Sequence, residues 1–146
     1  MAKKIPHKTH HKHVTVPACI VWCFDPRFSK LFQKYIKTHK FKHFDAVTVA
    51  GGAKDLVKSG TPEQAYVLSQ IEKSLKLHKP KTIHLMVHHN CGAYGQIELA
   101  KGQTEHEYLS AQAKTAVAQV AKFIQDRGYK ASIKASVADF SGIHLL

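Results

Sequence analysis

The chain has 146 residues, of which 44% are hydrophobic, and a formal net charge of +12. This length suits a single domain with a substantial core, and no apolar run approaches the about 18 residues of a membrane-spanning helix or forms a signal peptide. The three cysteines, an odd number, argue against a disulfide framework. We therefore expect a cytoplasmic protein without a membrane segment.

The positive charge is carried mainly by lysine, because Arg27 and Arg127 are the only arginines. Arginine is the usual reader of base edges, whereas lysine supplies a diffuse charge. We therefore expect no sequence-specific DNA recognition, although the charge is compatible with nonspecific attraction to nucleic acid or another polyanion. Residues 1–13 are rich in lysine and histidine and predict a solvated basic tail, followed by one domain over residues 14–146.

Residues 14–23 are mostly apolar, which predicts a strand covered on both faces and entered at Pro17. Asp25 is interpreted as a helix N-cap, with Pro26 at the first helical position. Apolar residues then recur at helical spacing and predict the buried face of a first helix: Phe28, Leu31, Phe32, Tyr35 and Ile36.

Residues 46–50 predict a short second strand, with Gly51 and Gly52 at its tip. A second helix is predicted after Thr61, which serves as its N-cap. The pattern of strand and then helix is thus repeated in this part of the chain.

Residues 82–88 predict a third strand, and Thr104 with Glu107 forms a capping box at the start of a third helix. The buried stripe of this helix is expected to contain Leu109, Ala113, Val117, Val120 and Ile124. Residues 131–137 predict a last strand. The alternation of strands and helices favours an α/β fold with a mostly parallel four-stranded sheet, flanking helices and right-handed crossovers.

Residues that can carry chemistry fall at the predicted carboxyl ends of three strands. Cys23 ends the first strand, Gly51 and Gly52 follow the second, and His88 and Cys91 lie at the end of the third. Open α/β sheets bind ligands at this edge. Two thiolates and one imidazole satisfy three corners of a tetrahedral zinc site, so the sequence predicts Zn²⁺ there.

Other residues of the same types are interpreted differently. Cys19 lies on the same strand as Cys23, about 13 Å away in an extended chain, and is assigned to the core. A thiolate-based phosphatase would need an arginine where Ser29 and Ile97 stand, which excludes that class. His89 would point to the opposite face of its strand, either as a proton shuttle or as a rim residue.

Two short motifs occur in order, Cys-x-Asp-x-Arg at residues 23–27 and His-x-x-Cys-Gly at residues 88–92. Together they resemble the β-class carbonic anhydrases. The resemblance implies that Cys23, His88 and Cys91 bind zinc. It also implies the strand order 2-1-3-4, which would bring these three ligands together.

The resemblance further implies a reaction, the reversible hydration of CO2 to bicarbonate by zinc-bound hydroxide. In it Arg27 keeps Asp25 ionised, and Asp25 orients the hydroxide toward CO2. Gly51, Gly52 and Gly92 are expected at the rim of the substrate site. A homodimer or a larger homo-oligomer is expected as well.

Two alternatives accompany this interpretation. Relatives of the same scaffold hydrolyse CS2 or COS with the same ligands, so the chain could be such a hydrolase. From another class, it could be a non-catalytic, zinc-stabilised protein that binds polyanions. At the level of single residues, Asp25 could serve only as a helix cap and Arg27 only as a surface charge.

Overall fold

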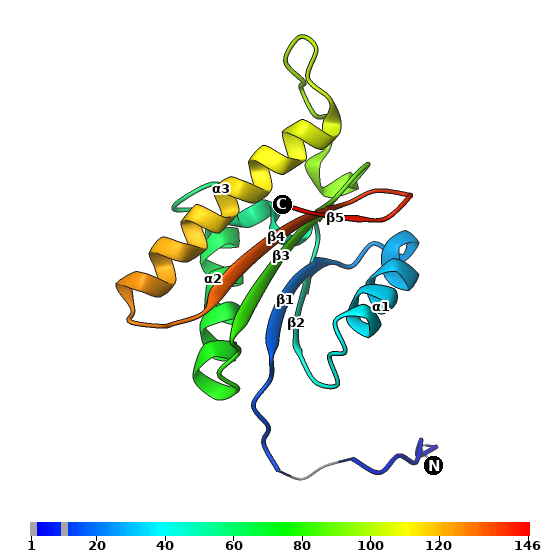
Figure 1. Ribbon diagram of the computed structural model, residues 1–146, viewed down its shortest axis with the longest axis vertical. Coiled ribbons are helices and arrows are strands. Elements are labelled where there is room, and N and C mark those ends of the chain that lie inside the picture. The colour runs from blue at the N-terminus through cyan, green and yellow to red at the C-terminus, as the bar shows by residue number, and fades with distance from the viewer. Residues whose placement is uncertain (1–2, 10–11) are drawn as a thin grey trace.

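The computed structural model describes residues 3–9 and 12–146 (Figure 1). In these residues the chain forms one five-stranded sheet with the order β2-β1-β3-β4-β5. The strands are β1 (Ala18–Cys23), β2 (Asp45–Val49), β3 (Thr82–His88), β4 (Ser132–Ala138) and β5 (Ile143–Leu145). The first four strands are parallel to one another, and β5 is antiparallel to β4.

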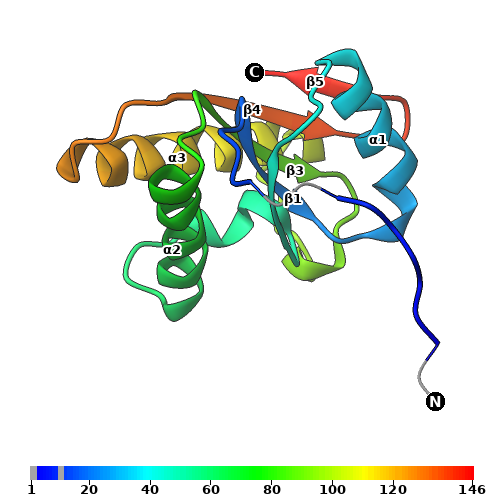
Figure 2. The same ribbon diagram turned by 90° about the horizontal axis from the view of Figure 1, so that it is seen from below.

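Three α-helices flank the sheet in the described part of the chain: α1 (Ser29–Thr38), α2 (Pro62–Leu77) and α3 (Glu105–Asp126). Figure 2 shows α1 on one face of the sheet and α2 with α3 on the other. Short 3-10 turns follow the carboxyl ends of the first three strands, at Pro26–Phe28, Gly52–Leu56 and Gly92–Tyr94. Across residues 3–9 and 12–146, no helix has the length and apolar character to span a membrane.

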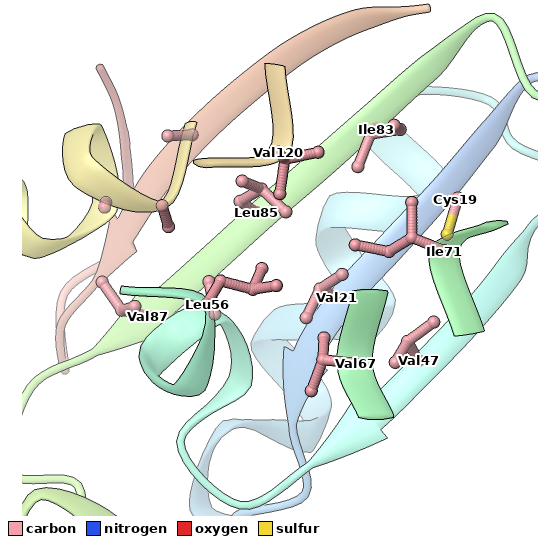
Figure 3. Packing of buried hydrophobic residues seen from close by; sticks show 14 of the residues in the cluster. Cys19, Val21, Val47, Leu56, Val67, Ile71, Ile83, Leu85, Val87 and Val120 are labelled. Carbon is pink, nitrogen blue, oxygen red and sulfur yellow. The ribbon is translucent and has the colours of Figure 1, made fainter. Parts of the chain in front are cut away.

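The core lies on both faces of the central strands. The larger cluster packs between the sheet and helices α2 and α3, and includes Cys19 and Val21 of β1 (Figure 3). The smaller cluster lies under α1 and includes Ile20 and Trp22 of the same strand. All six residues of β1 are buried, so the tip of this strand is held by packing on two sides.

The predicted fold class and the order 2-1-3-4 of the parallel strands are confirmed, with one strand more than predicted. The additional strand, β5, is only three residues long, and two of them are exposed, so it lacks the alternation that marks a strand. It is formed because Asp139 accepts hydrogen bonds from the backbone N–H groups of Ser141 and Gly142, which turns the chain back along β4.

The predicted helix caps are found in the structure. Thr61 accepts a hydrogen bond from the backbone N–H of Gln64, and Thr104 with Glu107 forms the capping box of α3. The first helix differs from the prediction, because a 3-10 turn comes before it and α1 begins only at Ser29. This turn keeps Asp25 close to the end of β1.

Candidate metal centre

The candidate centre lies where β1 and β3, which are hydrogen-bonded neighbours, reach their carboxyl ends. β1 ends at Cys23 and β3 ends at His88, and Cys91 precedes the 3-10 turn that follows β3. All three side chains are buried. The parallel order of the sheet therefore places two thiols and one imidazole at one edge, as the sequence predicted.

The three potential ligand atoms form a compact group. One ligand atom each of Cys23, His88 and Cys91 lies within 4.8 Å of the other two, and the two sulfurs are 3.9 Å apart. In a tetrahedral site with Zn–S bonds of about 2.3 Å, two thiolate sulfurs stand about 3.8 Å apart. The spacing of the sulfurs thus fits zinc ligation.

The hydrogen bonding of the His88 ring leaves one of its nitrogens available to a metal ion. Its Nδ1–H donates a hydrogen bond to the backbone carbonyl oxygen of His89 at 2.8 Å, which leaves the lone pair on Nε2. In the described residues Nε2 is buried and has no hydrogen-bond partner. An unsatisfied buried nitrogen costs free energy unless something binds it, so the donor set and its orientation both fit a zinc ion.

The two thiols influence each other's ionisation. A hydrogen bond with Cys91 lowers the pKa of Cys23 to about 4, helped by the backbone N–H groups of Asp25 and Gly51. The same contact with Cys23 raises the pKa of Cys91, and burial adds to this rise. One thiolate and one thiol therefore share a proton when no metal is bound, and a metal ion would displace that proton.

Gly51 and Gly52 lie behind the sulfur of Cys23. The backbone N–H of Gly51 donates a hydrogen bond to this sulfur at 3.3 Å. Gly52 has a positive φ of 57°, and a Cβ added to it would lie 2.3 Å from the backbone oxygen of Met86 in β3. Both glycines are buried. Of the three predicted rim glycines, Gly92 alone is exposed, and it lines an open pocket of about 370 Å³ beside Cys91.

Asp25 and Arg27 are paired through several hydrogen bonds. The guanidinium donates from Nε to Oδ1 at 3.0 Å and from NH2 to Oδ2 at 2.7 Å, and the backbone N–H of Arg27 also donates to Oδ1 at 3.0 Å. Hydrogen bonds from Arg27 lower the pKa of Asp25 to about 2. The Oδ2 atom of Asp25 lies 3.9 Å from Nε2 of His88, so an ionised carboxylate stands beside the three potential ligands.

Asn90 is a site residue to which the sequence analysis gave no role. Arg27 donates from NH1 to the side-chain oxygen of Asn90 at 2.9 Å and from NH2 to its backbone oxygen at 2.8 Å. Asn90 has a φ of 52°, a conformation that asparagine tolerates better than most residues. The position of Asn90 directly before Cys91 is the only feature of the sequence that could have indicated this role. Arg27 thus connects the turn after β1 with the turn after β3.

Cys19 and His89 stand apart from the three ligands. Cys19 is buried in the larger core cluster, where Figure 3 shows it near Ile71. His89 contacts His106 and Glu105 instead.

Comparison with known proteins gives a family and a fold. Residues 10–135 match a family model described as "Putative carbonic anhydrase", and no curated protein matches the chain. A carbonic anhydrase from Glaciozyma antarctica has a similar structure, with 14% identity, a TM-score of 0.55, and coverage of 91% of this chain and 83% of that one.

Two further solved structures give the same result. A β-carbonic anhydrase from Trichomonas vaginalis is 14% identical, with a TM-score of 0.54 and coverage of 96% of this chain and 87% of that one. One of two tetrameric β-carbonic anhydrases from Sordaria macrospora is 14% identical, with a TM-score of 0.51 and coverage of 90% and 81%. At these identities the likeness shows the fold.

Proposed function

Because the chain belongs to the carbonic anhydrase family, as a divergent member of its β class, we propose that it is a zinc enzyme that hydrates CO2 reversibly to bicarbonate. The observation that carries the proposal is the buried group of Cys23, His88 and Cys91 with an ionised carboxylate beside it. A structural zinc site with four cysteine or histidine ligands would have no need of that carboxylate.

The chain would hold zinc through both sulfurs and through Nε2 of His88, leaving one position of a tetrahedral site for a water molecule. When bound, zinc lowers the pKa of water and so supplies a nucleophile near neutral pH. The N–H of Gly51 and the carbonyl of His89 would orient the sulfur of Cys23 and the ring of His88.

Asp25 would accept a hydrogen bond from the reacting water and so direct a lone pair of its oxygen toward CO2. For this role the carboxylate must stay ionised, and Arg27 lowers its pKa to about 2. The carboxylate must also stay in place, and Arg27 is itself held by two hydrogen bonds to Asn90. Without this restraint, the carboxylate of Asp25 would be free to turn away from the position in which it accepts the hydrogen bond.

The protein is proposed to form a homo-oligomer in the cytoplasm. The related protein from Sordaria macrospora is described as tetrameric. Phe24, Phe140 and Leu145 are more than 60% exposed in the single chain, and association would cover such apolar surface. All three cysteines are free, as expected in a reducing compartment.

The decisive experiment measures CO2 hydration by the full-length, zinc-loaded protein, together with its zinc content. Cys19→Ala is the matched control, because it removes a buried sulfur outside the ligand group. We expect about one zinc at this centre and CO2 hydration in both proteins. Turnover of CS2 or COS without CO2 hydration would assign the alternative hydrolase. Zinc binding without turnover of any of the three substrates, together with polyanion binding, would assign the non-catalytic alternative.

A further inference from the structure

A second group of potential metal ligands lies beside the candidate centre. One ligand atom each of His89, His106 and Asp139 lies within 4.8 Å of the other two, and all three residues are partly buried. His89 follows the last residue of β3, His106 is in the first turn of α3, and Asp139 follows the last residue of β4. The fold thus brings three separate segments together at the same edge of the sheet as Cys23 and His88.

The two imidazoles have the spacing of metal ligands. Nε2 of His89 and Nδ1 of His106 are 3.2 Å apart. In a tetrahedral site with Zn–N bonds of about 2.0–2.1 Å, two ligand nitrogens stand about 3.3 Å apart. The other ring nitrogen of His89, Nδ1, lies 3.4 Å from Oε2 of Glu105. A proton on Nδ1 would face this carboxylate and leave the lone pair on Nε2, which is the arrangement usual for metal-binding histidines.

Asp139 is held in place by its own turn. Its Oδ1 accepts hydrogen bonds from the backbone N–H of Ser141 at 2.7 Å and from that of Gly142 at 2.9 Å, and the Ser141 hydroxyl donates to the same oxygen. Its Oδ2 lies 2.7 Å from Nε2 of His144. The hydrogen bonds from Ser141 hold the pKa of Asp139 far below its usual range, so the anion is already formed and oriented.

The local charge favours a cation, in contrast to the rest of the chain. Asp139 and Glu105 are two of the ten acidic residues in a chain whose net charge is +12. Asp139 is itself one of the three potential ligands, and Oε2 of Glu105 lies 3.4 Å from Nδ1 of His89. Imidazole nitrogens with one carboxylate oxygen form a donor set suited to zinc, cobalt and nickel.

We propose that His89, His106 and Asp139 bind a second divalent cation of this borderline class, separate from the ion of the first centre. His144 and Glu105 orient these ligands from outside. The two sites are also connected, because Oε1 of Glu105 accepts a hydrogen bond from the backbone N–H of Asn90 at 2.6 Å. The competing explanation is a simple hydrogen bond between the two imidazoles, which would hold a proton in place of a metal.

Cobalt titration of the metal-free, full-length protein separates these explanations. Because the histidines of the tail would compete for metal, the titration uses a chain in which His7, His10, His11 and His13 are replaced by glutamine. We expect two cobalt ions per chain. The ion at the cysteine site gives strong sulfur-to-cobalt charge-transfer absorption, whereas the ion at the second site gives only weak ligand-field bands.

The variants assign each signal to a site. His106→Gln and Asp139→Asn should each weaken binding of the second ion by at least about tenfold, with the charge-transfer band unchanged. Cys23→Ser should lose that band and keep the second ion. His43→Gln, which alters an exposed histidine elsewhere, should keep both ions.

The conservative change Asp139→Asn keeps an Oδ1 acceptor for the turn. Circular dichroism tests whether each variant is folded. Binding of a single cobalt ion by the parent chain would overturn the proposal. So would unchanged binding of the second ion by the folded His106→Gln and Asp139→Asn variants.

Discussion

The backbone N–H of Gly51 donates a hydrogen bond to the sulfur of Cys23 at 3.3 Å, from the turn after β2 to the tip of β1. This contact stabilises the thiolate, because a hydrogen bond to the charged form favours that form. Gly51 has a φ of 77°, and a Cβ added there would lie 2.9 Å from the side chain of Lys54. The residue thus combines a required backbone conformation with a contact to a potential metal ligand.

Gly51→Ala is expected to lower zinc affinity by about 10- to 100-fold, because the strained turn moves the N–H away from the sulfur. Gly60→Ala is the matched control: Gly60 has a φ of 78°, and a Cβ there would meet no atom within 4 Å. Both variants place an alanine at a positive φ, which destabilises the fold by about 1 kcal/mol or more. Competition with a zinc chelator measures the affinity, and an equal effect of the two substitutions would contradict the role of Gly51.

Gly52→Ala is expected to reduce the stability of the fold more than Gly51→Ala. The added Cβ would lie 2.3 Å from the backbone oxygen of Met86, so the turn after β2 would have to move away from β3. We expect a loss of about 3 kcal/mol in the free energy of unfolding, from overpacking and backbone strain together. Urea denaturation of the metal-free proteins measures it, and a loss no larger than that of Gly60→Ala would show that the turn yields easily.

The ligand assignment predicts a specific pattern of zinc contents. Cys23→Ser, His88→Ala and Cys91→Ser should each lose most of the metal, since each removes one of three protein ligands. Cys19→Ala should keep it, because Cys19 is buried in the core among apolar residues. Metal analysis after dialysis decides the point. Wild-type zinc content in any of the first three variants would remove that residue from the site.

The pairing of Asp25 with Arg27 predicts a loss of activity without a loss of metal. Arg27→Ala and Asp25→Asn should each lower CO2 hydration by about 10- to 100-fold, while zinc content stays unchanged. Stability should change little, since the side chain of Arg27 is 45% exposed. Lys30→Ala, which removes an exposed charge nearby on α1, is the control. Wild-type rates in both variants would reduce Asp25 to a helix cap.

His84 of β3 is buried, and among the described residues it forms no ion pair. Its Nδ1 shares a hydrogen bond with the hydroxyl of Tyr35, and its ring packs against His39 and Phe41. Burial, together with the nearby His39 and Lys134, lowers the pKa of His84 to about 4. The folded protein therefore keeps this imidazole neutral at pH values where the unfolded chain protonates it.

Stability is expected to fall with acidification between about pH 6.5 and pH 4, because only the unfolded chain takes up a proton at His84 in this range. A pKa lowered from 6.5 to about 4 corresponds to about 3 kcal/mol at the acidic end. His84→Gln removes the titrating group while retaining polar atoms for Tyr35. Urea denaturation across this pH range should show a smaller pH dependence in the variant, and equal pH dependence would contradict the prediction.

The parallel part of the sheet could be predicted because its first three strands are distinct apolar runs, each followed by a helix signal, and its fourth strand follows the end of the third helix. The strand β5 could not, because its three residues pair with β4 only after the turn at Asp139 has formed. The backbone hydrogen bonds of this turn depend on spatial arrangement rather than on a hydrophobic pattern.

The same distinction applies to the candidate centre. The types and positions of Cys23, His88 and Cys91 indicated a zinc site, since strand ends meet at one edge of a parallel sheet. The contact between Gly51 and Cys23 and the role of Asn90 were not predictable, because both depend on left-handed turns that bring distant segments into hydrogen-bond distance. The group of His89, His106 and Asp139 was not predictable either, because its members come from three separate segments of the chain.

Cys23 ends β1 and Cys91 follows the neighbouring strand β3, so their sulfurs lie close together although the residues are 68 positions apart in the sequence. The ligand group cannot exist until β1 has paired with β3, a long-range step that comes at the cost of closing a large loop. A metal ion that binds only after β1 and β3 have paired would have little effect on the rate at which the chain folds. It would instead slow the separation of β1 from β3, so metal loading would govern how long each folded molecule survives before it opens.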